Sequence, residues 1–161
     1  MNIRLPVSHY IIFQYGRSPE PRNDEDVKLL KHELPAEAKV DEKLLKMFSY
    51  QASGNLVSIA SIVGGIAAQE AMKAITHHMT PLRQFVYIDC LEALPGDWSP
   101  YDNEKLTAND CKMKNNRYDG QVAVFGQAFQ DALAKHNFFI VGAGAIGCEL
   151  LKNLAMMGVG C

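Results

Sequence analysis

The stretch that decides the fold is Phe138-Phe139-Ile140-Val141-Gly142-Ala143-Gly144-Ala145-Ile146-Gly147-Cys148-Glu149-Leu150-Leu151-Lys152-Asn153, near the end of the 161-residue chain. Its four leading apolar residues are typical of a strand that is covered on both faces. They run directly into Gly-x-Gly-x-x-Gly, and a helical pattern follows. This order of strand, glycine turn and helix is typical of the phosphate-binding turn of a Rossmann-type βαβ unit. A tight strand-to-helix turn without a ligand is the alternative.

Each glycine of the turn has an expected task. Gly142 permits the tight bend, Gly144 lets the backbone approach a pyrophosphate, and Gly147 lets the helix pack near the strand. The helix is expected over about 145–157, with Gly158 as its C-terminal cap. Its first N–H groups lack intrahelical partners, and its dipole favours an anion there.

The turn alone does not identify the nucleotide. In dinucleotide sites an acidic residue about 20 positions further on binds the ribose, and that position lies beyond Cys161. NAD, FAD and ATP therefore all stay open. The chain ends before the second strand of the unit could begin, so we expect an incomplete α/β unit.

Composition and charge are those of a soluble globular protein, with 48% apolar residues, 21% charged residues and a net charge of −2. This balance predicts no bulk attraction to nucleic acid or to an anionic membrane. The apolar stretch Leu56–Ile75 contains glycines and polar residues, so it favours a buried helix over a membrane span. No signal peptide is expected, which favours an intracellular protein.

Neither the cysteines nor the histidines form a recognisable metal or catalytic site. The four cysteines lie at positions 90, 111, 148 and 161, without C-x-x-C or zinc-like spacing, so reduced structural thiols are expected. His77 and His78 follow the end of a helix, where favourable contact with the dipole explains them better than a metal does.

The segment before the turn is rich in expected helices. The first is capped by Asn23 or Asp24, and the second begins near Asp41. The third, over about 56–75, has small residues along one side, so we expect it to be a central buried packing unit. Within it, Glu70 and Lys73 are expected to form a solvated surface pair.

The second half of the chain is expected to begin with a strand and a connector. Phe85–Leu91 has the pattern of a strand. Residues 96–115 are polar and contain proline and asparagine, which is typical of a connector. A helix that includes Phe129 and Leu133 follows it.

Three stretches together carry a resemblance to a known family. They are Ser53-Gly54-Asn55-Leu56 with Gly64-Gly65-Ile66-Ala67-Ala68-Gln69-Glu70-Ala71-Met72-Lys73-Ala74, then Asn116-Arg117-Tyr118-Asp119-Gly120-Gln121-Val122-Ala123-Val124-Phe125-Gly126, then Val141 to Asn153. In order and spacing they resemble the ubiquitin-activating enzymes, the E1 family, which is built on a ThiF/MoeB-like adenylation fold. The resemblance favours ATP over NAD.

The resemblance implies a layout for the chain. Members of the family carry an inactive and an active adenylation half. The implied fold class is α/β, an incomplete Rossmann-like ThiF/MoeB adenylation fold preceded by a helix-rich segment. The implied parts are residues 1–40 from a helical bundle, 41–95 from the C-terminal part of the inactive half, 96–115 as a connector, and 116–161 as the start of the active half.

The resemblance also implies a site. ATP would lie against the turn, with Ala145 near the nucleotide, and the lining residues would be Gly142, Ala143, Gly144, Ala145, Ile146 and Gly147. Simpler relatives carry a second arginine after their Arg-Tyr pair to reach the phosphates of a partner, whereas this chain has Gly120 there. Mg²⁺ is implied by the family, but its ligands are not in this chain. No catalytic residue and no metal ligand is assigned.

The family reaction is ATP-dependent adenylation of the ubiquitin C-terminal carboxylate, followed by transfer to a cysteine. The resemblance implies ubiquitin and E2 conjugating enzymes as partners of the full-length protein, in the cytoplasm and the nucleus. The chain is expected to be a fragment that is inactive alone. A truncated NAD(P)-dependent Rossmann oxidoreductase and a non-catalytic interaction fragment are the alternatives.

Overall fold

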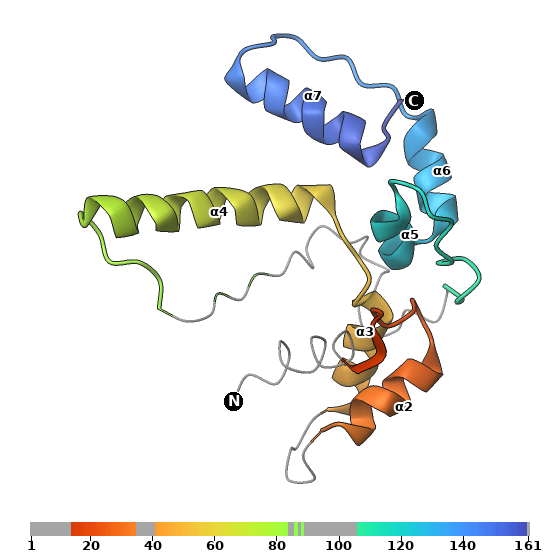
Figure 1. Cartoon of the computed structure of the whole chain (residues 1–161). Helices are drawn as coiled ribbons and strands as arrows, with labels where there is room; N and C mark the ends of the chain where they lie inside the picture. The colour runs from red at the N-terminus through yellow and green to blue at the C-terminus, as the bar shows by residue number, and fades with distance from the viewer. Residues whose placement is uncertain (1–13, 35–40, 84–85, 87, 89–105, 161) are drawn as a thin grey trace.

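The computed structural model describes residues 14–34, 41–83, 86, 88 and 106–160. In Figure 1, α2 and α3 form one end of the molecule, and α4 and α7 extend to the same side of it. The strand expected at 85–91 and the first part of the 96–115 connector lie outside the described residues, apart from 86 and 88. The helices that lie wholly within the described residues are α2 (Asp24–His32), α3 (Glu42–Gln51), α4 (Val57–Thr76), α5 (Asp119–Phe125), α6 (Gln127–Lys135) and α7 (Ala145–Met157).

Side-chain caps start α2 and α3, and the sequence predicts the cap at Asn23 and a helix that begins near Asp41. The side chain of Asn23 accepts a hydrogen bond from the N–H of Glu25 at 2.9 Å, and Asp41 accepts one from the N–H of Lys43 at 2.9 Å. Such caps satisfy N–H groups that have no partner within the helix. The two helices then pack against each other through a small apolar core, made by Leu30, Leu45 and the partly buried Leu34.

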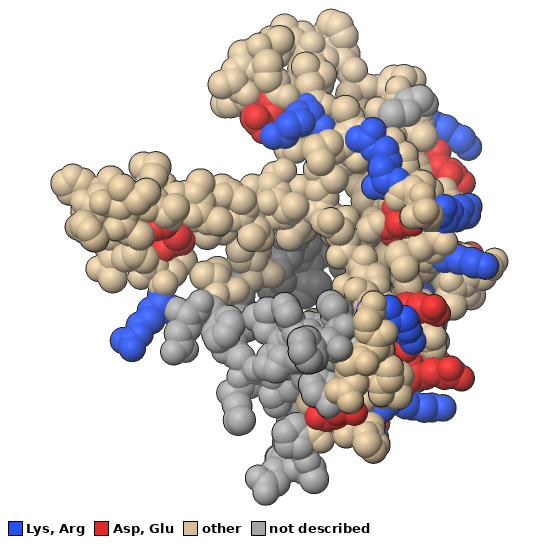
Figure 2. Space-filling view, viewed as in Figure 1, with Lys and Arg blue, Asp and Glu red and all other residues tan. Residues whose placement is uncertain are grey.

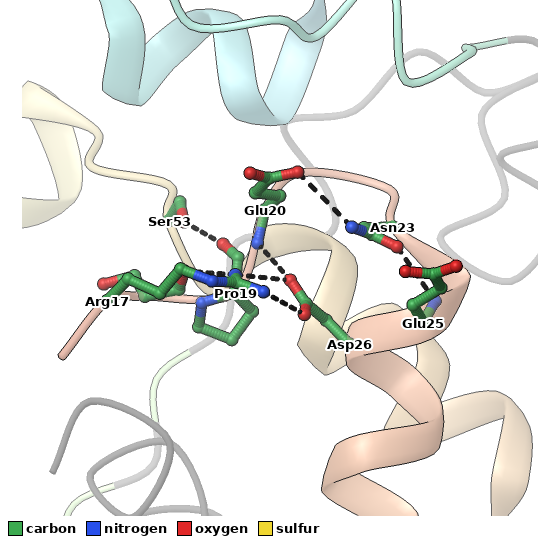
Figure 3. Close-up of polar contacts among 8 residues, drawn as sticks. Arg17, Pro19, Glu20, Asn23, Glu25, Asp26 and Ser53 are labelled. Carbon is green, nitrogen blue, oxygen red and sulfur yellow. Dashed lines mark hydrogen bonds and ion pairs between the residues drawn. The ribbon is translucent and has the colours of Figure 1, made fainter. Parts of the chain in front are cut away.

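A buried carboxylate ties the loop before α2 to that helix (Figure 3). Asp26 is 1% exposed and accepts hydrogen bonds from both terminal nitrogens of Arg17, at 2.7 and 2.9 Å. It also accepts the backbone N–H of Glu20 at 2.7 Å. The Arg17 guanidinium, and next the Glu20 N–H, hold the pKa of Asp26 below its ordinary value. The hydroxyl of Ser53 donates to the carbonyl of Pro19, so the loop also meets the segment after α3.

The expectation that the third helix is a buried packing unit is wrong for the described residues. No residue of α4 is buried, and Ile62, Val63, Met72 and Ile75 are 47%, 47%, 58% and 77% exposed. Small side chains permit close packing, but a helix is buried only where another element lies against it. Figure 2 shows that charged side chains gather beside α2, α5 and α6, whereas the visible surface of α4 is mostly uncharged.

Glu70 and Lys73 do more than form a solvated pair. The Nζ of Lys73 lies 2.7 Å from the Glu70 carboxylate, and both side chains are about one-fifth exposed, at 18% and 23%. The other carboxylate oxygen of Glu70 accepts the backbone N–H of Leu82 at 2.6 Å. Lys73 and this N–H lower the pKa of Glu70. The carboxylate therefore holds the segment that follows α4 back against the helix.

The strand expected at Phe138–Val141 is also not formed, and the described residues contain no strand. Phe138, Phe139 and Val141 are 63%, 94% and 85% exposed. A β-strand needs a neighbour to pair its backbone groups, and no described segment supplies one. The expected α/β class is thus seen only in its helical part.

Candidate phosphate-binding turn

The glycine turn leads from an extended segment into α7, and two of its glycines are required by the geometry. Gly142 has φ 97°, a left-handed conformation that suits glycine. A Cβ on Gly147 would lie 2.2 Å from the carbonyl oxygen of Gly142, so no side chain fits there. The tight bend is the task that the sequence predicts for Gly142, whereas Gly147 packs against the carbonyl of Gly142 and not against the expected strand, which is not formed.

The third glycine leaves open space beside the start of the helix. Nothing lies within 4 Å of the place where a Cβ of Gly144 would be. Gly144 is also the N-cap of α7, and it has no side chain that could occupy the N–H groups of the first turn. The region 141–146 is exposed to solvent. A phosphate could therefore approach these N–H groups, which is the geometry that anion binding at a helix start requires.

Cys148 stabilises the turn from within the helix. Its thiol donates to the carbonyl of Ala143 at 3.2 Å, and its N–H donates to the carbonyl of Gly144 at 2.9 Å. The side chain is exposed. The thiol thus serves the turn by a hydrogen bond rather than by packing in a core.

The first two of the three stretches quoted from the sequence meet at a backbone contact. The N–H of Asn55 donates to the carbonyl of Gly120 at 3.0 Å. A Cβ on Gly120 would lie 2.7 Å from the Cβ and the carbonyl oxygen of Asn55, and one on Gly54 would lie 2.4 Å from the Val124 side chain. An arginine at position 120 would collide with this contact. The structure thereby gives a steric reason for the glycine at that position.

The third stretch joins the second through the end of α7. The helix ends at Met157 with Gly158 in a left-handed conformation (φ 78°), so the predicted helix bounds and the predicted cap are confirmed. A Cβ on Gly158 would lie 2.7 Å from the Tyr118 ring and 2.8 Å from the side-chain nitrogen of Gln130. Gln121 and Gln130, which the sequence analysis did not single out, bind the last carbonyl of α7.

A separate open pocket of about 560 Å³ lies where α4, α5 and α7 meet. The residues of the glycine turn are not among those that line it, so it is distinct from the candidate site. Its polar lining includes Asn55, Ser61, Arg117, Lys152 and Asn153.

Two further features bear on the kind of site. Within the described residues no group of three or more His, Cys, Asp or Glu side chains is placed to hold a metal ion. His77, one of the two histidines considered for a metal, ends α4 in a left-handed conformation (φ 55°), and its N–H donates to the carbonyl of Lys73. None of the described helices combines the length and the apolar character that a membrane span requires.

Comparison with known proteins agrees with this geometry. Residues 118–161, which include the turn and α7, match the ThiF family. The chain is 46% identical over 171 aligned residues to ubiquitin-like modifier-activating enzyme 1 of Homo sapiens, a match that covers 100% of the chain and 16% of the relative. It is 44% identical to ubiquitin-activating enzyme E1 1 of Schizosaccharomyces pombe, over 96% of the chain and 16% of that protein.

A third relative has the same proportions. Ubiquitin-like modifier-activating enzyme 7 of Mus musculus is 42% identical over 91% of the chain and 15% of its own length. The chain thus spans about 16% of the length of the curated relatives that it matches. It is therefore a relative of the ubiquitin-activating enzymes of the E1 family that matches one segment of them, and it carries the ThiF-family match in residues 118–161.

Proposed function

We propose that this chain contributes the phosphate-binding turn of an ATP-dependent enzyme that activates ubiquitin or a related modifier. The observation that carries the proposal is the turn itself. Gly142 is left-handed, Gly147 has no room for a side chain, and Gly144 leaves open space beside the first N–H groups of α7. The match of residues 118–161 to the ThiF family supports ATP over a dinucleotide.

The proposed task of the turn is to bind and orient phosphate oxygens. The backbone N–H groups at the start of α7 would donate to them, and the helix dipole would favour their negative charge. ATP, when bound, would supply the adenylyl group that activates a carboxylate, with pyrophosphate as the leaving group. The proposed lining remains Gly142, Ala143, Gly144, Ala145, Ile146 and Gly147, and their role is a prediction.

Binding by the turn does not make the chain a catalyst. Phosphoryl chemistry depends on cations and polar groups that stabilise charge in the transition state. The nearest charged pair on α7 is Glu149 with Lys152, and these two side chains bind each other. We therefore propose that the chain alone does not adenylate ubiquitin, and that ubiquitin and E2 enzymes are partners of the longer protein. In that protein, Phe138–Val141 would gain neighbouring strands and become the expected strand.

A binding experiment on the 161-residue chain tests this proposal. Calorimetric titration with ATP should show binding that Gly144→Asp weakens at least tenfold, because a carboxylate would occupy the space that a phosphate needs. Gly65→Asp on α4 is the matched control, since Gly65 also has nothing within 4 Å of its missing Cβ but lies away from the turn. NAD serves as the competing nucleotide. Equal loss in both variants, or tighter binding of NAD than of ATP, would contradict the proposal.

Catalysis is tested separately. Pyrophosphate exchange that depends on ubiquitin should stay at background for the purified chain. Exchange above background would show that the chain contains charge-stabilising groups that this account does not assign.

A further inference from the structure

The C-terminal end of α7 is bound by two buried amides that come from other helices. Gln121 of α5 and Gln130 of α6 are 6% and 5% exposed. Their Nε2 atoms donate to the carbonyl oxygen of Met157 at 3.0 and 2.9 Å. The Nε2 of Gln121 also donates to the Oε1 of Gln130 at 2.7 Å. We call Gln121, Gln130 and the Met157 carbonyl the glutamine clamp.

The clamp completes the end of the helix. The last carbonyls of a helix lack partners within it. The N–H of Gly158 donates to the carbonyl of Ala155 at 3.2 Å, and the N–H of Val159 donates to that of Leu154 at 3.1 Å. These are the backbone bonds that usually cap a helix ending in a left-handed glycine. The carbonyl of Met157 is satisfied instead by the two side-chain amides.

The clamp lies where the two ends of the segment from α6 to the end of α7 come close together. The end of α7 returns to the neighbourhood of α6, as Figure 1 shows. A Cβ on Gly160 would lie 3.1 Å from the carbonyl oxygen of His136, so the chain that leaves α6 and the chain that leaves α7 run close together. The segment made of the extended residues, the glycine turn and α7 therefore begins and ends near the clamp.

Elsewhere along its length α7 lies beside α4. The hydroxyl of Ser61 on α4 donates to the side chain of Asn153 at 3.0 Å, and this hydrogen bond is exposed. No residue of α7 is buried. Two buried amides that are hydrogen-bonded to each other hold the direction of the helix better than one exposed hydrogen bond does, because solvent cannot replace their partners.

We propose that Gln121 and Gln130 are positioning residues that set the direction of α7 and thereby the place of the glycine turn at its other end. This inference rests on the proposed ATP-binding function of the turn. A helix of 13 residues is about 20 Å long. A tilt of roughly 5° at the clamp would therefore move the turn by about 1.7 Å. Displacements of about 1 Å already impair ligand orientation.

The test uses Gln121→Leu and Gln130→Leu in the 161-residue chain. Leucine keeps much of the side-chain volume and removes the donor to Met157. The matched control is Gln127→Leu on α6, whose amide donates to Asp131 at 2.8 Å within the same helix. Each variant is measured for amide hydrogen exchange in 142–157, for ATP affinity and for thermal unfolding. If a leucine variant loses its helical circular dichroism, Gln130→Asn is measured in its place. The asparagine keeps an amide, but its shorter side chain withdraws that amide from the carbonyl of Met157.

The inference predicts that the clamp variants exchange at least tenfold faster in 142–157 and bind ATP at least fivefold more weakly, while the control changes neither. Unchanged exchange in the clamp variants would overturn it. Faster exchange or a lower Tm with unchanged ATP affinity would also overturn it, since the glutamines would then be structural only. If the unaltered chain binds no ATP, the proposed function fails and this positioning role fails with it. If the unaltered chain binds ATP and the clamp variants bind it equally well, the proposed function stands and only the positioning role of the clamp is refuted.

Discussion

Replacing Asp26 by alanine should destabilise the α2–α3 end of the molecule more than replacing any other charged residue there. The carboxylate is 1% exposed and joins α2 to the loop that precedes it. Its loss removes both hydrogen bonds from Arg17 and leaves the N–H of Glu20 without this acceptor.

The magnitude follows from the exposure of each partner. The side chain of Arg17 is 44% exposed, so solvent screening limits its ion pair with Asp26 to about 1 kcal/mol. The hydrogen bond from the Glu20 N–H to the buried carboxylate contributes about 1.5–3 kcal/mol. Asp26→Ala should therefore lower the free energy of unfolding by about 2.5–4 kcal/mol.

The effect should also depend on pH in a defined direction. Because the pKa of Asp26 is lowered in the folded chain, its contribution is fully present above the unfolded value of about 3.9. It is lost as the pH falls through the lower folded pKa, when the carboxyl becomes protonated in both states. The difference between the unaltered chain and Asp26→Ala should thus be constant near neutral pH and shrink below about pH 4.

Urea unfolding followed by circular dichroism at pH 7 and pH 3 measures both effects, with amide exchange in Asp24–His32 to locate them. The matched control is Asp131→Ala on α6, an exposed carboxylate that accepts a hydrogen bond from the Gln127 side chain at 2.8 Å. It should change the free energy of unfolding by no more than about 0.5 kcal/mol. A loss under about 1 kcal/mol for Asp26→Ala, or one that is equally large at both pH values, would refute the reasoning.

Three further substitutions test other contacts. Gly158→Ala should lower the Tm and reduce the free energy of unfolding by about 1–3 kcal/mol, because a Cβ would lie 2.7 Å from the Tyr118 ring and the backbone is left-handed there. Calorimetry measures this loss, and an unchanged Tm would contradict the contact. Gly120→Ala should cost about 1–3 kcal/mol by separating α5 from Asn55, and a thermal shift no larger than that of Gly64→Ala, which faces open space, would count against it. Glu70→Gln should speed limited proteolysis after Arg83 several-fold by weakening the bond to the Leu82 N–H, whereas equal cleavage rates would argue against this tether.

Local features of the fold were predictable because they depend on neighbouring residues. Asn23 and Asp41 cap their helices through hydrogen bonds two positions away. The bounds of α7 follow from the glycine before it and from Gly158 after it, so they too are confirmed. In each case a short stretch of sequence contains both partners of the interaction.

Burial and strand pairing could not be predicted in this way, because they require an element that is distant in sequence. α4 has the composition of a buried helix, yet none of its residues is buried by the described elements. Phe138–Val141 has the composition of a covered strand, yet no described strand lies beside it. Apolar composition therefore predicts what a segment can bury, but not whether a partner is present.

In the candidate site, too, local features could be predicted and long-range contacts could not. The tight bend at Gly142 follows from the spacing of the motif, and its φ of 97° agrees with it. Gly147 instead packs against the carbonyl of Gly142, because the expected strand is not formed. The contact of Gly120 with Asn55 and the clamp by Gln121 join residues far apart in the chain, and no local pattern indicated which residues would be their partners. A glutamine within an otherwise apolar helix was the one local signal, and its partner could not be found without the structure.

The most direct test of the central claim is a nuclear magnetic resonance titration of the ¹⁵N-labelled chain with ATP. The claim predicts that the largest amide shifts fall on the backbone of Gly142 to Gly147 and on the first turn of α7. Largest shifts at the open pocket between α4, α5 and α7, around Arg117 and Lys152, would contradict it and place the anion elsewhere.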